Sequence, residues 1–280
     1  MDILVDAAWL ADHRADVVVA DVRFYLDGRS PLDAYVAGHL PGAVYVDLGR
    51  DLSSPRDATA GRHPLPSPDE FAVAMVRLGI GDDDVVVAYD DSGGGTTGRL
   101  VWMLRATGHD AALLDGGLPA WPGPVASGPA PERPPASFTA RPWPGGALAD
   151  AEEVAALAAS SSAAVLDARA AERYRGDTEP VDPRAGHIPG AANAPWQDNL
   201  DPATGRFLAP AALRARFEAL GVRDGEPVVA YCGSGVSACA DLVALERAGI
   251  SGARLYVASW SGWSADPDRP AAIGDGAMPE

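Results

Sequence analysis

The segment VVAYCGSGVSA, residues 228–238, decides the fold expected for this chain. It joins four apolar residues typical of a buried strand to a loop of small residues, and then to a helical stretch. The same four letters, VVAY, recur at residues 86–89, where Asp90 follows them in place of Cys232. A strand that leads through a short loop into a helix is the building unit of parallel α/β sheets.

Three further motifs occur twice, in the same order: Asp-x-Arg at 21–23 and 167–169, GH(L/I)PGA at 38–43 and 186–191, and LLDGGLPAW (113–121) against LYVASWSGW (255–263). The second copy of Asp-x-Arg lies 146 residues after the first, and that of GH(L/I)PGA lies 148 residues after. For VVAY and for the last motif the offset is 142 residues. A nearly constant offset indicates an internal duplication. We therefore predict an α/β fold with two tandem domains, each a mostly parallel sheet flanked by helices.

We place the first domain at residues 1–124 and the second at 147–280, with a loose tail from about 266. Residues 125–146 are rich in Pro and Gly, which is typical of an extended linker. Within the first domain, the apolar runs and helical patterns predict three strands and two helices: 17–22, 85–89 and 111–115, then 68–78 and 97–107.

The composition limits the classes of partner. The 280 residues carry a formal charge of −17, and all 22 basic residues are arginines, so nucleic acids and anionic membrane surfaces are unsuitable partners. No apolar stretch approaches the roughly 20 residues that span a bilayer, and the N-terminal residues lack the apolar run of a signal peptide. We expect a cytoplasmic protein.

Cys232 is the candidate nucleophile. Backbone N–H groups of a loop and the N-terminus of a helix stabilise a thiolate, and Gly233 and Gly235 allow the backbone to bend around the sulfur. The alternative is a buried structural cysteine. Because Asp90 replaces the thiol in the first copy, we expect one catalytic domain and one supporting domain.

The other cysteine, Cys239, lies about two turns into the following helix, where we expect a buried apolar role. A redox role is the alternative. Two cysteines seven residues apart provide neither a disulfide framework nor a zinc site, so we expect no cofactor and no metal.

The chain resembles the tandem rhodanese-domain sulfurtransferases over nearly its full length, through CGSGVSA (232–238), both GH(L/I)PGA motifs and the closing SWSGW. The resemblance implies that Cys232 carries sulfur as a persulfide and passes it to a thiol, a thioredoxin or cyanide. The loop is most similar to the 3-mercaptopyruvate branch, because thiosulfate-specific members usually have a basic residue where this chain has Gly233. Ser237 stands where that branch usually has threonine.

The same resemblance assigns the donor site. Two arginines of the 3-mercaptopyruvate branch that bind the donor's carboxylate and keto groups correspond to Arg173 and Arg184. An arginine fork suits a planar 2-oxo acid. The alternative is that both arginines pair with nearby acids of the same segment. The remaining donor-site residues are Gly233, Gly235, Val236 and Ser237.

The resemblance also pairs His63 with Ser234 as a proton relay. In that branch an acid supports the histidine; here the aligned position is Gly49, and Asp47 and Asp51 flank it. A surface histidine is the alternative for His63. His39 and His187 belong to motifs present in both copies, so we expect structural roles for them (the catalytic thiol is in one copy only).

Other motifs bear on alternative functions. Residues 93–98 fit G-x-G-x-x-G, but they duplicate the cysteine loop and follow a strand that is not the first of its unit, which argues against a dinucleotide site. A rhodanese-like phosphatase needs an arginine where this chain has Ala238. A thiosulfate:cyanide sulfurtransferase is the main alternative, and a non-enzymatic scaffold a distant one. The oligomeric state is left open.

Overall fold

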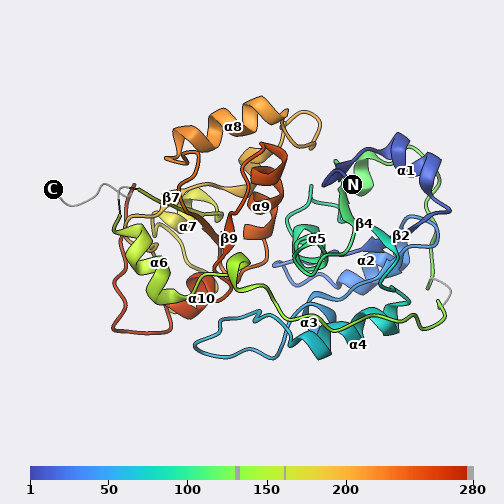
Figure 1. Cartoon of the computed structure of the whole chain (residues 1–280), viewed down its shortest axis with the longest axis horizontal. Coiled ribbons are helices and arrows are strands. Elements are labelled where there is room, and N and C mark those ends of the chain that lie inside the picture. The colour runs from blue at the N-terminus through green and yellow to red at the C-terminus, as the bar shows by residue number, and fades with distance from the viewer. Residues whose placement is uncertain (130–132, 161, 276–280) are drawn as a thin grey trace. The chain divides into compact units, whose positions relative to one another are not determined.

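The computed structural model describes residues 1–129, 133–160 and 162–275, and the chain forms two compact units. The first consists of Met1–Ser54, Leu65–Trp143 and Pro202–Phe207, and the second of Pro55–Pro64, Pro144–Asp201 and Leu208–Glu280. Each unit therefore includes a short segment from the other half of the sequence. Figure 1 shows the elements of both units.

The first unit has a five-stranded parallel sheet in the order β1-β5-β4-β2-β3. Its strands are Leu4–Val5, Val17–Asp21, Val44–Tyr45, Val85–Tyr89 and Ala111–Leu114, β1 to β5. Its helices are Ala7–His13, Pro31–Ala37, Leu48–Asp51, Pro68–Leu78 and Thr97–Ala106, α1 to α5, with a 3₁₀ turn η1 at Leu118–Ala120. The predicted strands and helices of this unit are confirmed to within one residue.

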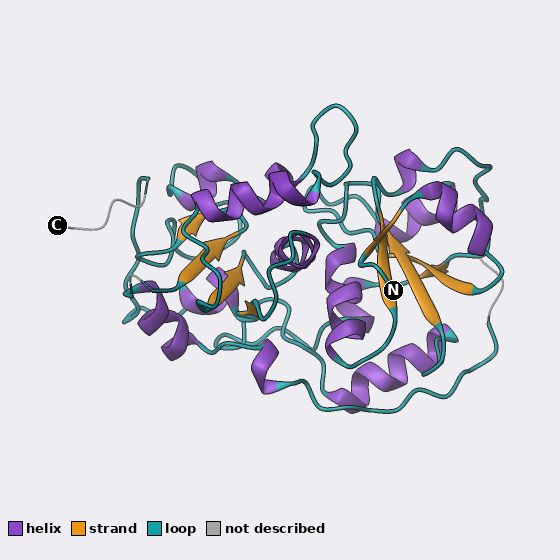
Figure 2. Ribbon diagram, turned by 45° about the horizontal axis from the view of Figure 1, so that its top comes forward, coloured by secondary structure: helices purple, strands orange, loops and turns teal. Residues whose placement is uncertain are grey.

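The second unit has a four-stranded parallel sheet in the order β7-β6-β8-β9. Its strands are Ala164–Asp167, Ala192–Asn193, Val228–Tyr231 and Arg254–Leu255, β6 to β9. Its helices are Ala151–Ala158, Ala171–Tyr174, Pro210–Ala219, Ala238–Arg247 and Ser259–Trp263, α6 to α10, with 3₁₀ turns η2 at Gly145–Ala147 and η3 at Trp196–Asn199. Figure 2 shows helices around the strands of each unit, which confirms the predicted α/β class.

Apolar packing holds α6 and α10 against the second sheet. Trp260 and Trp263 of α10 are buried in one cluster with Val229 and Tyr231 of β8 and with Val154 of α6. Burying two indoles provides a large share of the hydrophobic stabilisation of a sheet this small. Because α10 is anchored in this way, its first residues have fixed positions beside the carboxyl end of β8.

The duplicated motifs form the same network in each unit. In the second, Arg169 binds the carboxylate of Asp167 and donates to the carbonyl of Gly186 at 2.7 Å, while the Tyr231 hydroxyl accepts the backbone N–H of Ile188. His187 stacks on Tyr174 and its Nδ1 lies 2.8 Å from that residue's carbonyl oxygen.

The first unit repeats these contacts with the corresponding residues Asp21, Arg23, Gly38, Tyr89 and Leu40, and with His39 stacked on Tyr35. Both histidines are buried and engaged in this way. These contacts agree with the structural roles expected for them.

Hydrogen bonds hold the described residues of the expected linker and of the expected tail. Between residues 125 and 143, the described part of the linker contacts the first unit, where Ala126 bridges His39 and Thr139 binds Asp82. In the stretch expected as a tail, Ala272 forms a β-bridge with His187, and the Gly274 N–H donates to the carbonyl oxygen of Arg175. Residues 276–280 lie outside the described residues.

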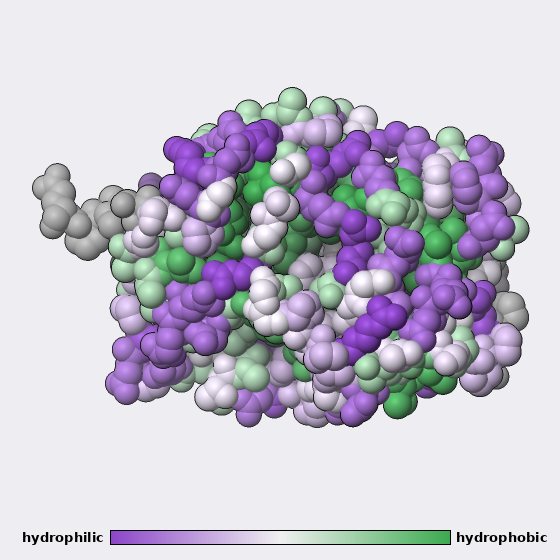
Figure 3. Space-filling model, viewed as in Figure 1, coloured by the Kyte–Doolittle hydropathy of each residue, from purple (hydrophilic) through white to green (hydrophobic). Residues whose placement is uncertain are grey.

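Figure 3 shows one face of the molecule, on which hydrophilic residues surround smaller hydrophobic patches. Within the described residues, every helix is too short or too polar to cross a membrane.

Candidate active site

Cys232 lies at the carboxyl end of β8, is 2% exposed and is a free thiol. The start of α10 holds its backbone on both sides. The Cys232 N–H donates to Ser259 Oγ at 3.1 Å, and its carbonyl oxygen accepts the N–H of Trp260 at 2.9 Å. The next carbonyl, of Gly233, accepts the N–H of Ser261. The SWSGW motif therefore fixes the backbone of Cys232, the candidate nucleophile.

Two backbone features of this loop are unusual. Ser259 has a φ of 52°, which is costly for a residue with a Cβ. Gly235 has a φ of 72°, and a Cβ there would lie 2.6 Å from the carbonyl oxygen of Val257. Only glycine can take this place without moving the backbone.

The corresponding loop of the first unit binds a carboxylate. Asp90 is 1% exposed, and its Oδ1 accepts the backbone N–H groups of Ser92 and Gly94 at 2.9 and 2.8 Å. Its Oδ2 accepts those of Thr96 and Thr97 at 3.1 and 3.2 Å. Four N–H groups that converge on one anionic side chain form an anion cradle. The loop type is therefore suited to holding negative charge at the position that Cys232 occupies in the second copy.

His63 and Ser234 form the expected pair. His63 Nδ1 lies 2.8 Å from Ser234 Oγ, across 171 residues of sequence. His63 belongs to the segment 55–64, which packs with the second unit. The segment is held there by a hydrogen bond from the Arg62 N–H to Ser261 Oγ at 2.9 Å, and Gly61 lies against Ala258 so closely that a Cβ would be 2.5 Å from its carbonyl oxygen.

Two guanidiniums face the residue after the nucleophile. A Cβ at Gly233 would lie 3.0 Å from Arg62 Nη2 and 3.5 Å from Arg173 Nη1. Arg173 is at the end of α7, whereas Arg62 precedes His63 in the segment 55–64. Any larger side chain at position 233 would therefore compete for space with these two cations.

A chain of alternating charges holds these arginines. It runs from the sheet to the segment 55–64 through Asp167, Arg169, Glu179, Arg173, Asp182 and Arg62. The carboxyl pKa of Glu179 is lowered, because hydrogen bonds from the Asp182 backbone and from Arg173 outweigh the effect of burial. Burial is the largest influence on Asp182 and raises its pKa, although Arg62 and Arg173 oppose this.

Arg184 makes a different set of contacts from those expected. Its Nε, Nη1 and Nη2 donate to backbone carbonyl oxygens, those of Trp263, Ser264, Asp266 and Arg269. Its own carbonyl oxygen accepts the indole N–H of Trp260. All three guanidinium nitrogens are therefore used to hold the end of α10 and the turn after it. The structure does not bring this side chain into the group of contacts around Gly233.

The acids considered for His63 have other partners. Asp47 accepts the Arg50 N–H as the N-cap of α3, and Asp51 binds the guanidiniums of Arg50 and Arg77. Cys239 is fully buried in α9, and its Sγ lies 3.4 Å from the Gly235 carbonyl oxygen, a contact that suits a packing role.

The remaining predicted donor-site residues, Val236 and Ser237, follow Gly235 in the same loop; Val236 is buried, and Ser237 is the N-terminal cap position of α9.

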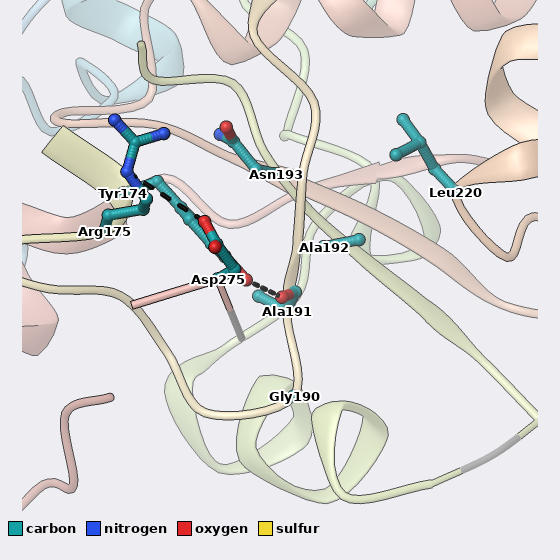
Figure 4. Close-up of a pocket in the computed structure, with 8 residues that line it drawn as sticks. All are labelled: Tyr174, Arg175, Gly190, Ala191, Ala192, Asn193, Leu220 and Asp275. Carbon is teal, nitrogen blue, oxygen red and sulfur yellow. Dashed lines mark hydrogen bonds and ion pairs between the residues drawn. The ribbon is translucent and has the colours of Figure 1, made fainter. Parts of the chain in front are cut away.

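A pocket of about 370 Å³ lies elsewhere in the second unit (Figure 4). Tyr174, Arg175, Asn193 and Asp275 are among the residues around it. The Tyr174 hydroxyl donates to Ala191, Asn193 donates to two backbone carbonyls, and Arg175 pairs with Asp275. None of the residues predicted for the site is among those that line this pocket.

Sequence reasoning missed Arg62, Asp182 and Ser259 as contributors to the site. Arg62 is adjacent to His63 in GRHPLP, and Ser259 opens the SWSGW motif, so both lay within motifs that had been recognised. Asp182 is one of the nearby acids that the alternative interpretation pairs with the arginines, and the structure does pair it with Arg173. Arg62 is 120 residues from Asp182 in the sequence, and Ser259 is 27 residues from Cys232, so no local pattern encodes these contacts.

Comparison with known proteins identifies the family. The model of the rhodanese-like domain matches residues 6–123 and 150–266. A Pseudomonas aeruginosa protein named "Probable 3-mercaptopyruvate sulfurtransferase" is 46% identical over 270 residues, 93% of each chain. A Mycobacterium tuberculosis protein named "Putative thiosulfate sulfurtransferase SseB" is 41% identical over 288 residues, 97% of each chain.

Among solved structures, SseA from Escherichia coli, described under the rhodanese fold and mechanism of 3-mercaptopyruvate sulfotransferases, superposes with a TM-score of 0.80 at 33% identity. The match covers 93% of this chain and 99% of that one. Two matched domains, a shared fold and high coverage lead to one conclusion: the chain belongs to the rhodanese family, as a tandem-domain sulfurtransferase.

Proposed function

We propose that this enzyme transfers sulfur from 3-mercaptopyruvate, through a persulfide on Cys232, to a thiol acceptor. The observation that carries the donor assignment is the pair of guanidiniums at Gly233, next to the nucleophile. A 2-oxo acid has a carboxylate that two arginines can bind, and its reacting sulfur is two bonds from the keto carbon. The names of the P. aeruginosa and E. coli relatives support this donor.

In the first half-reaction, the Cys232 thiolate attacks the donor sulfur. A sulfur–sulfur bond forms, the carbon–sulfur bond of the donor breaks, and the bonding electron pair leaves on the enolate of pyruvate. The enolate carbon takes up the proton that the donor thiol had carried. The products are pyruvate and an anionic persulfide on Cys232, so atoms and charge balance.

The Ser234–His63 pair is the relay for that proton. At 2.8 Å, the hydroxyl and the imidazole can exchange a proton, and Ser234 is two residues beyond the nucleophile. The pair would accept the thiol proton of the donor and return it to the enolate. Arg62 and Arg173 would hold the carboxylate during this transfer, and Gly233, Gly235, Val236 and Ser237 would surround the donor.

The persulfide anion needs stabilisation until the acceptor arrives. The Asp90 cradle supports the role of the loop N–H groups in this, because the same loop type in this chain binds a carboxylate with four of them. A thiolate acceptor, such as a thioredoxin, or cyanide then attacks the outer sulfur and restores the Cys232 thiolate. A thiolate nucleophile operates in a reducing compartment, and we propose the cytoplasm.

The test is a donor comparison on the unmodified enzyme, with pyruvate release and acceptor sulfuration measured for 3-mercaptopyruvate, and thiocyanate formation measured for thiosulfate with cyanide. We expect the larger kcat/KM with 3-mercaptopyruvate. Higher turnover with thiosulfate would reject the donor and make the enzyme a thiosulfate:cyanide sulfurtransferase. Cys232→Ser is the control, and it should release no pyruvate with any acceptor.

A further inference from the structure

Asp182 binds two arginines with one carboxylate. Its Oδ1 pairs with Arg62 Nη1, and its Oδ2 lies 3.1 Å from Arg173 Nη2. The Asp182 side chain is 0% exposed, while those of Arg62 and Arg173 are 16% and 15% exposed. The carboxylate is therefore fully covered, whereas the guanidiniums that cover it still reach solvent.

Arg62 turns toward Gly233 the amino group that Asp182 does not bind, whereas both amino groups of Arg173 lie near Gly233, with Nη1 the nearer one. Arg62 Nη2 and Arg173 Nη1 are the nitrogens nearest to a Cβ at Gly233, at 3.0 and 3.5 Å. Arg62 Nη1 and Arg173 Nη2 are the nitrogens bound to Asp182. Because a guanidinium is planar and rigid, fixing one amino group determines where the other points. Asp182 thus holds both guanidiniums from one side and directs their other amino groups toward the loop of the nucleophile.

Asp182 is itself held in place. Its backbone N–H donates to Glu179 Oε1 at 3.0 Å, and the N–H of Val181 donates to the same oxygen. Glu179 Oε1 also accepts Arg173 Nη2 at 2.7 Å. The segment 179–182 therefore folds around the carboxylate of Glu179. This fold fixes the carboxylate of Asp182 between Arg62 and Arg173.

We propose that Asp182 is the positioning residue that sets the spacing and direction of Arg62 and Arg173, and through them the selectivity of the site for a 2-oxo carboxylate. This inference rests on the proposed function, because it concerns the donor of that reaction. Asp182 acts through the two arginines. It does not itself bind the donor.

The loss of the Asp182 carboxylate could change donor binding in either direction, and a simple charge argument predicts tighter binding. Arg62 and Arg173 together carry two positive charges, and Glu179 and Asp182 carry two negative ones. If Asp182 only competed with the donor for the guanidiniums, its removal would leave a more positive site and tighten the binding of an anion. If it positions them, its removal releases two long side chains, and donor binding weakens. The two accounts differ in the sign of the change.

The experiment uses Asp182→Asn, which removes the charge, and Asp182→Glu, which keeps the charge but moves the carboxylate by one methylene. The matched control is Asp177→Asn, five residues before Asp182, where the acid is exposed and pairs with Arg175. For both Asp182 variants we expect the KM for 3-mercaptopyruvate to rise by about tenfold, with kcat changed by less than about threefold. The control should leave both constants unchanged.

A second measurement separates this inference from the reaction itself. Pyruvate, which has the 2-oxo carboxylate but no sulfur, is titrated calorimetrically into Cys232→Ser protein with and without Asp182→Asn or Asp182→Glu. We expect the pyruvate Kd to rise by about tenfold in both Asp182 variants.

An unchanged or lower Kd in either folded variant overturns the positioning role, as does a failure of the Cys232→Ser protein to bind pyruvate. Failure of the proposed function has a different result: the unmodified enzyme releases no pyruvate from 3-mercaptopyruvate. Circular dichroism identifies a variant that does not fold, and the other variant then decides.

Discussion

Ser259 Oγ accepts the backbone N–H of Cys232 at 3.1 Å, although Ser259 itself has a left-handed φ of 52°. Ser259 also donates to the carbonyl oxygen of Tyr256 at 2.9 Å and is fully buried. A strained residue at the first position of α10 thus holds the backbone of Cys232, the proposed nucleophile. The strain is maintained by the burial of Trp260 and Trp263, which fixes the helix.

This contact gives a prediction for two variants of Ser259. Ser259→Ala keeps the strain and leaves the Cys232 N–H without its acceptor, so we expect a loss of about 1–3 kcal/mol of stability and about a tenfold loss of kcat. Ser259→Gly loses the same acceptor but relieves the strain, so its stability should exceed that of Ser259→Ala by about 1 kcal/mol. Urea unfolding and pyruvate release measure the two effects. Equal stability of the two variants would contradict the strain argument.

Asp90 should stabilise the first unit. Asp90→Ala leaves four N–H groups, three of them buried, without their acceptor, and we expect a loss of about 2–4 kcal/mol in the free energy of unfolding. Asp90→Asn keeps one acceptor oxygen and should lose less. Asp83→Ala, at an exposed turn residue, is the control and should change stability by less than about 0.5 kcal/mol. Equal stability of Asp90→Ala and the control, by urea unfolding, would refute the cradle.

Arg173 and Arg184 should differ in what they affect. Arg173→Ala removes a guanidinium at Gly233, so we expect the KM for 3-mercaptopyruvate to rise by about 10- to 100-fold. Because the buried carboxylates of Glu179 and Asp182 also lose a partner, we expect a loss of about 1–3 kcal/mol of stability. Arg184→Ala leaves four carbonyl oxygens near α10 without their donor and should lower stability by about 2–4 kcal/mol, with a KM close to that of the unmodified enzyme. Steady-state kinetics and thermal melts distinguish them. A large rise in KM for a well-folded Arg184→Ala would return Arg184 to the donor site.

His63 and Ser234 should act as one unit. His63→Gln and Ser234→Ala each break the same hydrogen bond, and we expect each to lower kcat for pyruvate release by about 100-fold. Because either change disables the relay, the double variant should be little worse than each single one. Single-turnover measurement of pyruvate tests this. Multiplicative losses in the double variant would show that the two residues act separately.

Asp241 should make stability depend on pH. It is fully buried in α9, and burial raises its carboxyl pKa to about 7, against the opposing effects of Arg216 and of the hydrogen bond from Asn199. Because the folded pKa lies above the unfolded one, this group lowers stability progressively as the pH rises from about 4 to 7. The slope is roughly 1.4 kcal/mol per pH unit for one proton.

The variant Asp241→Asn removes this titration and keeps an oxygen that can accept from Asn199. Its stability advantage over the unmodified protein should grow between pH 5 and pH 7 and stay constant above about pH 8. Urea unfolding at several pH values measures it. An advantage that does not vary with pH would mean that Asp241 keeps an ordinary pKa in the folded protein.

The sequence by itself determined the fold class and the duplication, and it singled out Cys232 as the candidate nucleophile. These follow from local signals: apolar runs of strand length, loops of small residues, and motifs repeated at nearly constant offsets. The replacement of the thiol by Asp90 was visible in the same way. The domain boundaries at 124 and 147 stay predictions. In the structure, residues 55–64 belong to the second unit and residues 202–207 to the first. No shift in composition marks these segments in the sequence.

Only the tertiary structure decided which side chains surround Cys232. Arg62 and His63 reach Gly233 and Ser234 because the segment 55–64 packs with the second unit. In the sequence, His63 and Ser234 are 171 residues apart. Arg184 fitted a donor-binding pattern, yet the carbonyl groups at the end of α10 occupy all three of its nitrogens. The physical reason is that strand and helix patterns depend on residues a few positions apart. The partners of a long charged side chain depend instead on which distant groups the packed chain brings within hydrogen-bonding distance.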